Sequence, residues 1–287
     1  MLLFSALVAG SFSLGARMAR EIDPGVLVLL RFGLAALLMV AILRASTGRW
    51  PTVPRAAWRF VVLGGFFGFY FIMMFEGLKT ADAVSSAAVF TLTPLMSAVF
   101  ALPLLGQRTV LAVWGALLLG ACGALWVIFR GDMPALLAFD IGTGEAIFFV
   151  GCIAHAIYTP LSRRLNRGES AGEAALWVMV GGILLLLIYA GPRLAGVDWA
   201  ALSPLVWITL AYLVVFTTAG TTTLLQYAAL RLPASNVMAY TYLVPSWVVL
   251  WDMATGFTAP PGIILLGVGA TVLALLVLLL RHDVAAI

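Results

Sequence analysis

Four ionisable side chains stand out because they lie inside or at the edge of apolar runs in this 287-residue chain. Arg31 and His155 lie well inside such runs, whereas Glu76 and Lys79 lie near the end of one. If the runs cross a membrane, each charge is costly there and marks a functional role or an internal partner. Glu76 and Lys79 are three residues apart, which predicts an ion pair on one helix face. Arg31 is expected to brace carbonyl groups or to reach the outer surface, with substrate contact as the alternative.

His155 and Tyr158 are three residues apart, so both side chains project from one face of a helix. An imidazole at this depth either bonds a hydroxyl within the protein or lines a substrate cavity, and the sequence leaves both open. Tyr70, in an aromatic and Met-rich run, is a further candidate for substrate contact. These side chains supply hydrogen bonds and aromatic faces, which suit a small polar molecule that carries a ring.

Two stripes of polar and aromatic residues have helical spacing. One consists of Thr218, Thr222 and Gln226. The other consists of Asn236, Tyr240, Trp247 and Trp251. Such stripes suit a cavity wall, because amides and hydroxyls bond polar groups while tryptophan offers its face to a ring or a cation. The alternative is that the polar residues hold helices together and the aromatic residues lie at the membrane interface.

The elements that position these residues are predicted to be membrane helices. The chain is 63% hydrophobic and 10% charged, with a mean hydropathy of +1.11, whereas soluble domains are about half apolar and about a quarter charged. A bilayer needs roughly 20 apolar residues per helix, which leaves room for about ten crossings. The spans are expected at 1–17, 24–44, 57–78, 82–105, 109–129, 142–162, 171–191, 203–230, 233–254 and 260–280.

Several function classes do not fit this sequence. The net charge of +4 comes from basic residues scattered between apolar runs, which argues against a nucleic-acid partner. Cys122 and Cys152 lie in apolar runs without metal-ligand spacing, so we expect packing roles, no metal and no cofactor. The sequence has no HExxH motif and no pair of intramembrane acids, so an enzyme is not expected. A channel or a scaffold remains a rival to a carrier.

Basic residues in the short loops predict the orientation. The even-numbered loops and the C-terminal end contain ten of them, namely Arg44, Arg49, Arg55, Arg59, Arg108, Arg163, Arg164, Arg167, Arg231 and Arg281. The odd-numbered loops contain five, namely Arg17, Arg20, Lys79, Arg130 and Arg193. Because Lys and Arg are enriched in cytoplasmic loops, both termini are predicted to be cytoplasmic.

The two halves of the chain share a weak repeat. The segment GLKTADAVSSAAVFTLTPLMSAVFALPLLGQ, 77–107, is echoed by ALRLPASNVMAYTYLVPSWVVLWDMATG, 229–256. We therefore divide the chain into residues 1–135 and 136–287, each with five spans. Because five is odd, the second half enters the membrane from the opposite side. Such inverted repeats place a substrate site at the interface between the halves.

Pro94 and Pro245 lie at matched depths in the fourth and ninth spans. Proline removes one helix hydrogen bond and clashes with the preceding turn, so each residue predicts a kink. The released carbonyl group needs a partner from a neighbouring helix, a hydroxyl or water. We expect both prolines to act as hinges beside a central cavity, although prolines in membrane helices also occur for packing alone.

These motifs, together with VLLRFGLAAL around Arg31, resemble the EamA-type branch of the drug/metabolite transporter superfamily. The resemblance covers the whole chain and is strongest to the YddG-type aromatic amino acid exporters of bacterial inner membranes. It implies two inverted five-helix halves around a central cavity, with the prolines as bending points. The chain departs from the family at Gln107, where a glutamate is common, and in MATGFTAP, 253–260, which has no acid at the matching place. No role of that acid is carried over.

The resemblance and the candidate residues together predict an all-α carrier of the bacterial inner membrane. It exports amino acids, aromatic ones included, and similar small zwitterions by alternating access. The spans have no Asp or Glu at mid-depth, and proton relays usually use such acids, so transport down the substrate gradient is expected. The alternative is a proton-coupled exporter of drugs or of other metabolites such as sugar nucleotides, with His155 as the proton-linked group. The expected partners are a small-molecule substrate and the lipid bilayer, with a monomer as the simplest assembly.

Overall fold

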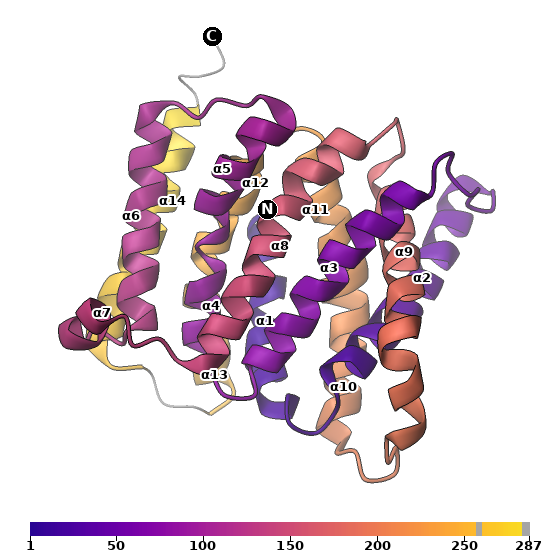
Figure 1. Ribbon diagram of the computed structural model, residues 1–287, viewed down its shortest axis with the longest axis horizontal. Helices are drawn as coiled ribbons and strands as arrows, with labels where there is room; N and C mark the ends of the chain where they lie inside the picture. The colour runs from indigo at the N-terminus through magenta and orange to yellow at the C-terminus, as the bar shows by residue number, and fades with distance from the viewer. Residues whose placement is uncertain (257–259, 283–287) are drawn as a thin grey trace.

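A computed structural model describes residues 1–256 and 260–282 of the chain. Within these residues the structure contains helices and no strands (Figure 1). Eight stretches are long and apolar enough to cross a membrane, namely Pro24–Thr47, Trp58–Gly77, Ala83–Leu105, Leu111–Ile128, Thr143–Leu165, Ala171–Gly196, Pro204–Ala229 and Gly262–Leu280. The prediction of an all-helical membrane protein is confirmed.

The helices follow the predicted spans closely. The first half contains α1 (Leu2–Met18), α2 (Pro24–Thr47), α3 (Trp58–Gly77), α4 (Ala83–Phe90), α5 (Thr93–Leu105) and α6 (Leu111–Ile128). The second half contains α8 (Thr143–Leu165), α9 (Ala171–Ala190), α10 (Pro204–Tyr212), α11 (Thr221–Ala229), α12 (Ala234–Ala239), α13 (Val244–Ala254) and α14 (Gly262–His282). A short helix, α7 (Met133–Ala138), lies where we placed the boundary between the halves.

Three irregular helices complete the chain: the 3₁₀ helix η1 (Gly191–Gly196), the π-helix η2 (Leu213–Gly220) and the 3₁₀ helix η3 (Tyr240–Leu243). The fourth span is divided into α4 and α5, the eighth into α10, η2 and α11, and the ninth into α12, η3 and α13. The first span is apolar but only 17 residues long. The count of ten crossings therefore stays a prediction.

The fourth and ninth spans are each divided just before a proline. Pro94 and Pro245 each occupy the first turn of the second piece, α5 or α13, and both are buried. Pro94 has no N–H for the carbonyl of Phe90, and the Thr93 hydroxyl donates to that oxygen instead, at 2.6 Å. In the ninth span, Thr271 of α14 donates its hydroxyl to the carbonyl of Tyr242 at 2.9 Å. The predicted kinks are present, and hydroxyl groups satisfy carbonyls beside them.

The tightest helix contacts join the two halves of the chain. α3 packs against α8 and α9, α2 packs against α9, and α6 packs against α14. α5 packs against α8, just as the corresponding α13 of the second half packs against α1. Exchanging the halves maps these contacts onto one another, as expected for two related repeats. Figure 1 shows the result: α6 and α14 lie side by side at one edge of the molecule, and α2 and α9 lie at the other.

Glycine residues bring two of these helix pairs into backbone contact. A methyl group added at Gly64 of α3 would lie 2.2 Å from the backbone nitrogen of Gly182 of α9. A methyl group added at Gly123 of α6 would lie 2.7 Å from the carbonyl oxygen of Gly267 of α14. Small residues at such crossings let membrane helices approach closely, so they gain packing energy that larger side chains would prevent.

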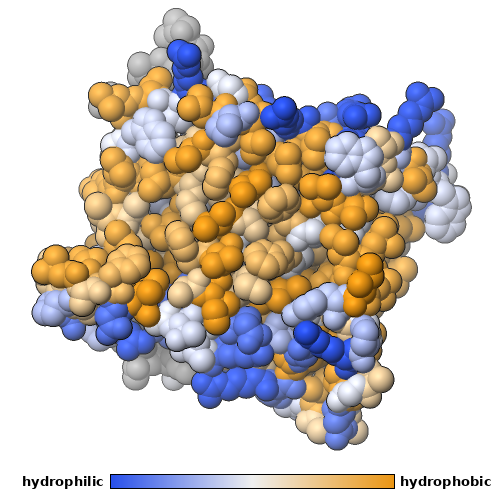
Figure 2. Space-filling view, in the orientation of Figure 1, coloured by the Kyte–Doolittle hydropathy of each residue, from blue (hydrophilic) through white to orange (hydrophobic). Residues whose placement is uncertain are grey.

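The surface has an apolar middle band and polar ends. Figure 2 shows hydrophobic residues across the centre of one face, with hydrophilic residues gathered above and below them. The loops α2–α3, α5–α6, α8–α9 and α11–α12 meet at one end, where Arg163 donates to the carbonyl of Leu232 at 3.2 Å. We call this the basic end. At the opposite end, Arg20 donates to the carbonyl of Lys79 at 2.8 Å and joins two odd-numbered loops. The loops therefore alternate between two ends, as expected for a multi-pass membrane protein.

Candidate functional site

A small cavity lies between the two halves of the chain. Its volume is about 20 Å³, which is room for about one water molecule. The aromatic side chains in its wall are Phe4, Phe67, Tyr70, Phe71, Phe90 and His155, from α1, α3, α4 and α8. Thr217 and Thr221 of the eighth span add hydroxyl groups. The cavity is therefore a mostly aromatic space with a few polar groups, which is the kind of lining that small-molecule sites have.

His155 lies within a cluster of rings. Its imidazole stacks on Tyr70 with the ring centres 4.3 Å apart, and the ring of Phe90 is 5.5 Å away. Both ring nitrogens are buried and have no hydrogen-bond partner among the residues that the structure describes. Leaving a buried polar atom unpaired costs about 1–3 kcal/mol, so such atoms need an explanation. His155 lines the cavity, so both nitrogens are placed to bond a small molecule there.

Tyr158 and Gln226 meet next to this cluster. The Gln226 amide donates to the Tyr158 hydroxyl at 2.7 Å and accepts from the Ser162 hydroxyl at 2.6 Å. The ring of Tyr158 stacks on Phe67, with centres 4.8 Å apart. The structure therefore brings together four predicted residues, Tyr70, His155, Tyr158 and Gln226, although the last two lie behind the cavity wall rather than in it.

Of the two structural roles expected for Arg31, the structure shows bracing between helices, and the side chain does not reach the outer surface. The side chain is fully buried. Its Nε donates to the Thr218 hydroxyl at 2.8 Å and its Nη2 to the Thr217 hydroxyl at 3.3 Å. The guanidinium carbon lies 3.8 Å from the ring centre of Phe71, a cation–π contact. Arg31 therefore braces the eighth span through hydroxyl groups rather than carbonyl groups.

The two threonines that hold Arg31 belong to the π-helix η2. At its end the Thr221 N–H donates to the carbonyl of Phe216, five residues earlier. π-Helical turns are rare and frequently lie at functional sites, because they widen the helix and change the direction of side chains. The sequence stripe of Thr218, Thr222 and Gln226 crosses this irregular segment, and all three side chains are buried.

The predicted stripe on the ninth span is not assembled at the cavity. Asn236, Tyr240 and Trp247 are absent from the residues of its wall. Tyr240 packs against a second hydrophobic cluster that contains Tyr242, whereas Trp247 donates to the Ser5 hydroxyl of α1 at 3.2 Å. The reason is η3: a 3₁₀ helix turns about 20° more per residue than an α-helix, so its four residues rotate the following helix by roughly 80°.

The hinge prolines also do not line the cavity. Pro94 and Pro245 are buried in the protein interior, and neither is part of the cavity wall. Phe90, at the end of the helix piece before Pro94, is the residue of the fourth span that lines it. Among the described residues, only the fourth of these two spans therefore reaches the cavity, through the helix piece that precedes its break.

The structure also tests the predictions for one ion pair and two cysteines, and it places Gln107. Glu76 and Lys79 form the predicted ion pair at 2.7 Å, with side chains 41% and 31% exposed, so the pair is structural and contributes little. Cys152 is buried as expected, but Cys122 is exposed, so its packing role was wrong. Gln107 accepts the N–H of Ala234 at 3.4 Å, which ties α5 to the start of α12. Residues 257–259 of MATGFTAP lie outside the described residues.

Glu145 is a buried acid that the sequence reasoning missed. It lies in the first turn of α8 and accepts a hydrogen bond from the Ser85 hydroxyl of α4 at 2.7 Å. The contact joins the two halves at the end opposite the basic end. Its position inside the predicted span 142–162 could have indicated that Glu145 is buried. We did not select it because acids near the start of a span usually lie at the surface.

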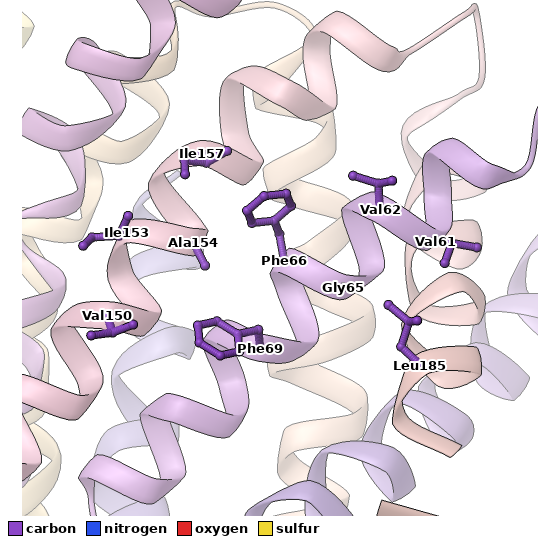
Figure 3. A pocket seen from close by; sticks show the side chains of 10 residues that line it. All are labelled: Val61, Val62, Gly65, Phe66, Phe69, Val150, Ile153, Ala154, Ile157 and Leu185. Carbon is purple, nitrogen blue, oxygen red and sulfur yellow. The ribbon is translucent and has the colours of Figure 1, made fainter. Parts of the chain in front are cut away.

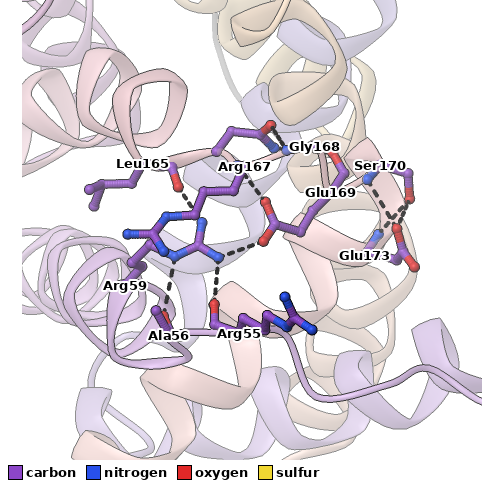
Figure 4. Close-up of polar contacts among 10 residues, drawn as sticks. Arg55, Ala56, Arg59, Leu165, Arg167, Gly168, Glu169, Ser170 and Glu173 are labelled. Atoms are coloured by element: carbon purple, nitrogen blue, oxygen red, sulfur yellow. Dashed lines mark hydrogen bonds and ion pairs between the residues drawn. The ribbon is translucent and has the colours of Figure 1, made fainter.

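A second missed contact joins the halves at the basic end (Figure 4). Arg59 of α3 is 1% exposed, and its Nη2 lies 2.6 Å from Oε1 of Glu169, which is 14% exposed. Arg59 also donates to the carbonyls of Ala56 and Leu165. Partial burial alone would raise the pKa of Glu169, but hydrogen bonds from Arg59 and from the N–H of Arg167 outweigh it and lower the pKa.

A wider hollow on the outer surface does not have the chemistry of a substrate site. It measures about 580 Å³ and lies between α3 and α8, with Leu185 of α9 at its edge (Figure 3). Its lining side chains are all apolar, including Phe66, Phe69, Ile153 and Ile157. A binding site needs a few polar groups to orient a polar molecule, so this hollow suits lipid hydrocarbon instead.

Comparison with known proteins identifies the family. The model of the EamA-like transporter family matches residues 1–129 and 142–280. The chain belongs to the EamA-like transporter family. This transporter is 27% identical over 260 residues to "Uncharacterized transporter YyaM" of Bacillus subtilis (strain 168), an alignment that covers 88% of this chain and 84% of that protein. A solved crystal structure superimposes with a TM-score of 0.71 at 20% identity, over 100% of this chain and 98% of the other.

These likenesses confirm a transporter and not an enzyme. The two matched segments of the family model correspond to the two halves with their interlocking helices. At 20% identity the solved structure shows the fold alone. The YddG-type specificity, the substrate and the orientation in the membrane stay predictions.

Proposed function

We propose that this EamA-like transporter exports amino acids, aromatic ones included, across a bacterial inner membrane by alternating access. The observation that carries the proposal is the aromatic wall of the cavity between the halves, with the unbonded nitrogens of His155 beside Tyr70. An aromatic amino acid offers a ring for the wall and polar groups for the imidazole and the threonine hydroxyls.

Alternating access is supported by the contacts at the two ends. The cavity of about 20 Å³ is too small for an amino acid, so substrate entry requires the halves to move apart. Contacts between the halves close both ends: Arg59 with Glu169 at the basic end, and Ser85 with Glu145 at the other. Opening one end while the other stays closed is the motion that inverted-repeat carriers use. We place the basic end and both termini in the cytoplasm, in line with the positive-inside rule.

Transport down the substrate gradient is the coupling we propose. No Asp or Glu is among the described residues that line the cavity, and proton relays usually use such acids. Glu145 is buried, but it lies in the first turn of α8, near the end of the span.

The test is counterflow of labelled phenylalanine and alanine into proteoliposomes that contain the purified protein. Saturable uptake that is accelerated by internal amino acid is expected, with and without a pH gradient. If neither amino acid is exchanged, the substrate proposal is wrong. If a pH gradient alone drives accumulation, the proton-coupled alternative is correct.

A pair of tyrosine variants tests the position of the site. Tyr70→Leu removes a ring from the cavity wall and is expected to slow phenylalanine exchange more than alanine exchange. Tyr227→Leu is the matched control, because Tyr227 is 54% exposed on the outer surface. Equal effects of the two variants on phenylalanine exchange would place the aromatic contact elsewhere.

A further inference from the structure

Arg31 is a buried cation without an anionic partner. The ion pairs found in residues 1–256 and 260–282 join Arg59 to Glu169, Lys79 to Glu76, Arg130 to Asp82, and Arg193 to Asp23. In the part of the chain that the structure describes, Arg31 contacts the two threonine hydroxyls and the rings of Phe71 and Phe75, and its Nη1 has no partner. Neutral contacts of this kind offset only part of the cost of removing a charge from water.

The guanidinium lies directly behind the cavity wall. Phe71 and Thr217, which touch it, both line the cavity. Thr217 also donates its own hydroxyl to the carbonyl of Leu213 at 3.1 Å, so the direction of its oxygen is fixed. In a medium of low dielectric constant, a charge one side chain away acts strongly on the contents of the cavity. The cavity is therefore a place where an anion is stabilised and a cation is destabilised.

We propose that the carboxylate of the transported molecule is the missing counter-ion of Arg31. The inference rests on the proposed function and names the part of the substrate that the site selects. When the halves separate, a carboxylate that enters beside Thr217 reaches the free Nη1, and the ring of the substrate lies against Tyr70 and Phe90. A charge-assisted pair with arginine is the strongest type of hydrogen bond available in the cavity.

Because the substrate carboxylate pairs with Arg31, the carboxylate of an amino acid is essential for binding and its ammonium group is dispensable. Since no acid lines the described cavity, a positive group on the substrate has only aromatic faces and neutral polar groups, such as the Thr221 hydroxyl, to contact. The ligand class is therefore an aromatic monocarboxylate, whether or not it carries an amino group. This goes beyond the zwitterion that the sequence predicts.

Two analogues of phenylalanine separate the contributions of its charged groups. Phenylpropionate lacks the ammonium group, and phenethylamine lacks the carboxylate. As competitors of phenylalanine counterflow in wild-type proteoliposomes, phenylpropionate is expected to act at roughly tenfold lower concentration or better than phenethylamine. Competition by phenethylamine at equal or lower concentration would overturn the assignment of a carboxylate to Arg31.

A binding measurement keeps this test separate from the test of the proposed function. Thermal stabilisation of the purified protein by each analogue needs no transport. If phenylalanine is not exchanged but phenylpropionate alone stabilises the protein, the proposed function fails and the carboxylate site stands. If phenylalanine is exchanged but both analogues stabilise the protein equally, the function stands and the carboxylate site fails.

Two substitutions link the preference to Arg31. Arg31→Gln is expected to abolish the preference for phenylpropionate over phenethylamine, while Arg31→Lys, which keeps the charge, retains part of it. Arg193→Gln is the matched control, because it removes a cation from an exposed pair at the protein surface. A preference that persists undiminished in a folded Arg31→Gln protein would show that another group selects the carboxylate.

Discussion

Replacing Glu169 with glutamine is expected to favour opening of the basic end. Arg59 is almost fully buried, and its charged bond to Glu169 is 2.6 Å long and joins α3 of the first half to the loop before α9 of the second. A hydrogen bond between charged groups contributes about 1.5–3 kcal/mol, and a neutral amide keeps about 1 kcal/mol of it. The net loss of roughly 0.5–2 kcal/mol shifts the equilibrium between closed and open forms by about 2- to 30-fold.

Cys152 provides the assay. The side chain is buried in α8, three residues before His155, so a maleimide reaches it only when the halves separate. Replacing the exposed Cys122 with serine leaves one thiol in the chain. The alkylation rate of Cys152 in the Glu169→Gln protein is expected to rise by about the same 2- to 30-fold if opening is in rapid equilibrium.

Glu173→Gln is the matched control for this experiment. Glu173 carries the same charge four residues away, but it bonds only within its own helix cap, to Ser170. Its loss is expected to leave alkylation of Cys152 unchanged. Equal rates in the Glu169→Gln and Glu173→Gln proteins would refute the view that the bond between Arg59 and Glu169 holds the basic end closed.

Acid is expected to act in the same direction as the glutamine variant. The pKa of Glu169 in the folded protein is lowered, so its bond to Arg59 contributes fully above the ordinary pKa of a glutamate. That contribution is lost as the pH falls through the lowered value. The rate at which iodoacetamide alkylates Cys152 is divided by its rate with a small free thiol at the same pH. This ratio should therefore rise at low pH in the wild type but not in Glu169→Gln.

Two further substitutions test the packing and the polar network. Gly181→Ala is expected to lower the unfolding free energy by about 1–3 kcal/mol, because the new methyl group would lie 2.1 Å from the carbonyl oxygen of Phe60. The measurement is the melting temperature in detergent. Gly33→Ala is the control and should not lower that temperature, because a methyl group there meets nothing within 4 Å. Tyr158→Phe leaves the buried Gln226 amide without its partner and is expected to raise the concentration for half-maximal counterflow by roughly tenfold. Tyr242→Phe is the control, because it loses a comparable bond to the carbonyl of Leu117 outside the cavity. An equal rise in the half-maximal concentration in Tyr242→Phe would show that the Tyr158 network has no special role in transport.

The parts of the fold that were predicted from sequence depend on local chemistry. Apolar runs form helices because the backbone must satisfy its own hydrogen bonds in lipid. Pro94 and Pro245 break their spans because proline has no N–H, wherever the helix packs. The pair of Glu76 and Lys79 was predictable because three residues separate them on one helix.

The parts that were not predicted depend on contacts between distant segments. Arg59 was counted as a loop cation, yet α3 and the loop before α9 bury it against Glu169. Arg31 was expected to brace carbonyl groups or to reach the outer surface, and only the position of η2 places hydroxyl groups within its reach. The stripe from Asn236 to Trp251 assumed one continuous helix, and the turn of η3 removes that register.

The backbone contacts through glycine limit how the two halves of this transporter can move. Gly64 with Gly182 fastens a helix of the first half to one of the second, and Gly123 with Gly267 does the same at the other side of the molecule. Because the halves touch backbone to backbone at both edges, an end opens when the halves pivot at these crossings, and the crossings themselves stay closed. A chain cut between 129 and 142 would yield fragments that must reassociate before any part can rock, and co-expression of the two pieces should restore a carrier that neither piece forms alone.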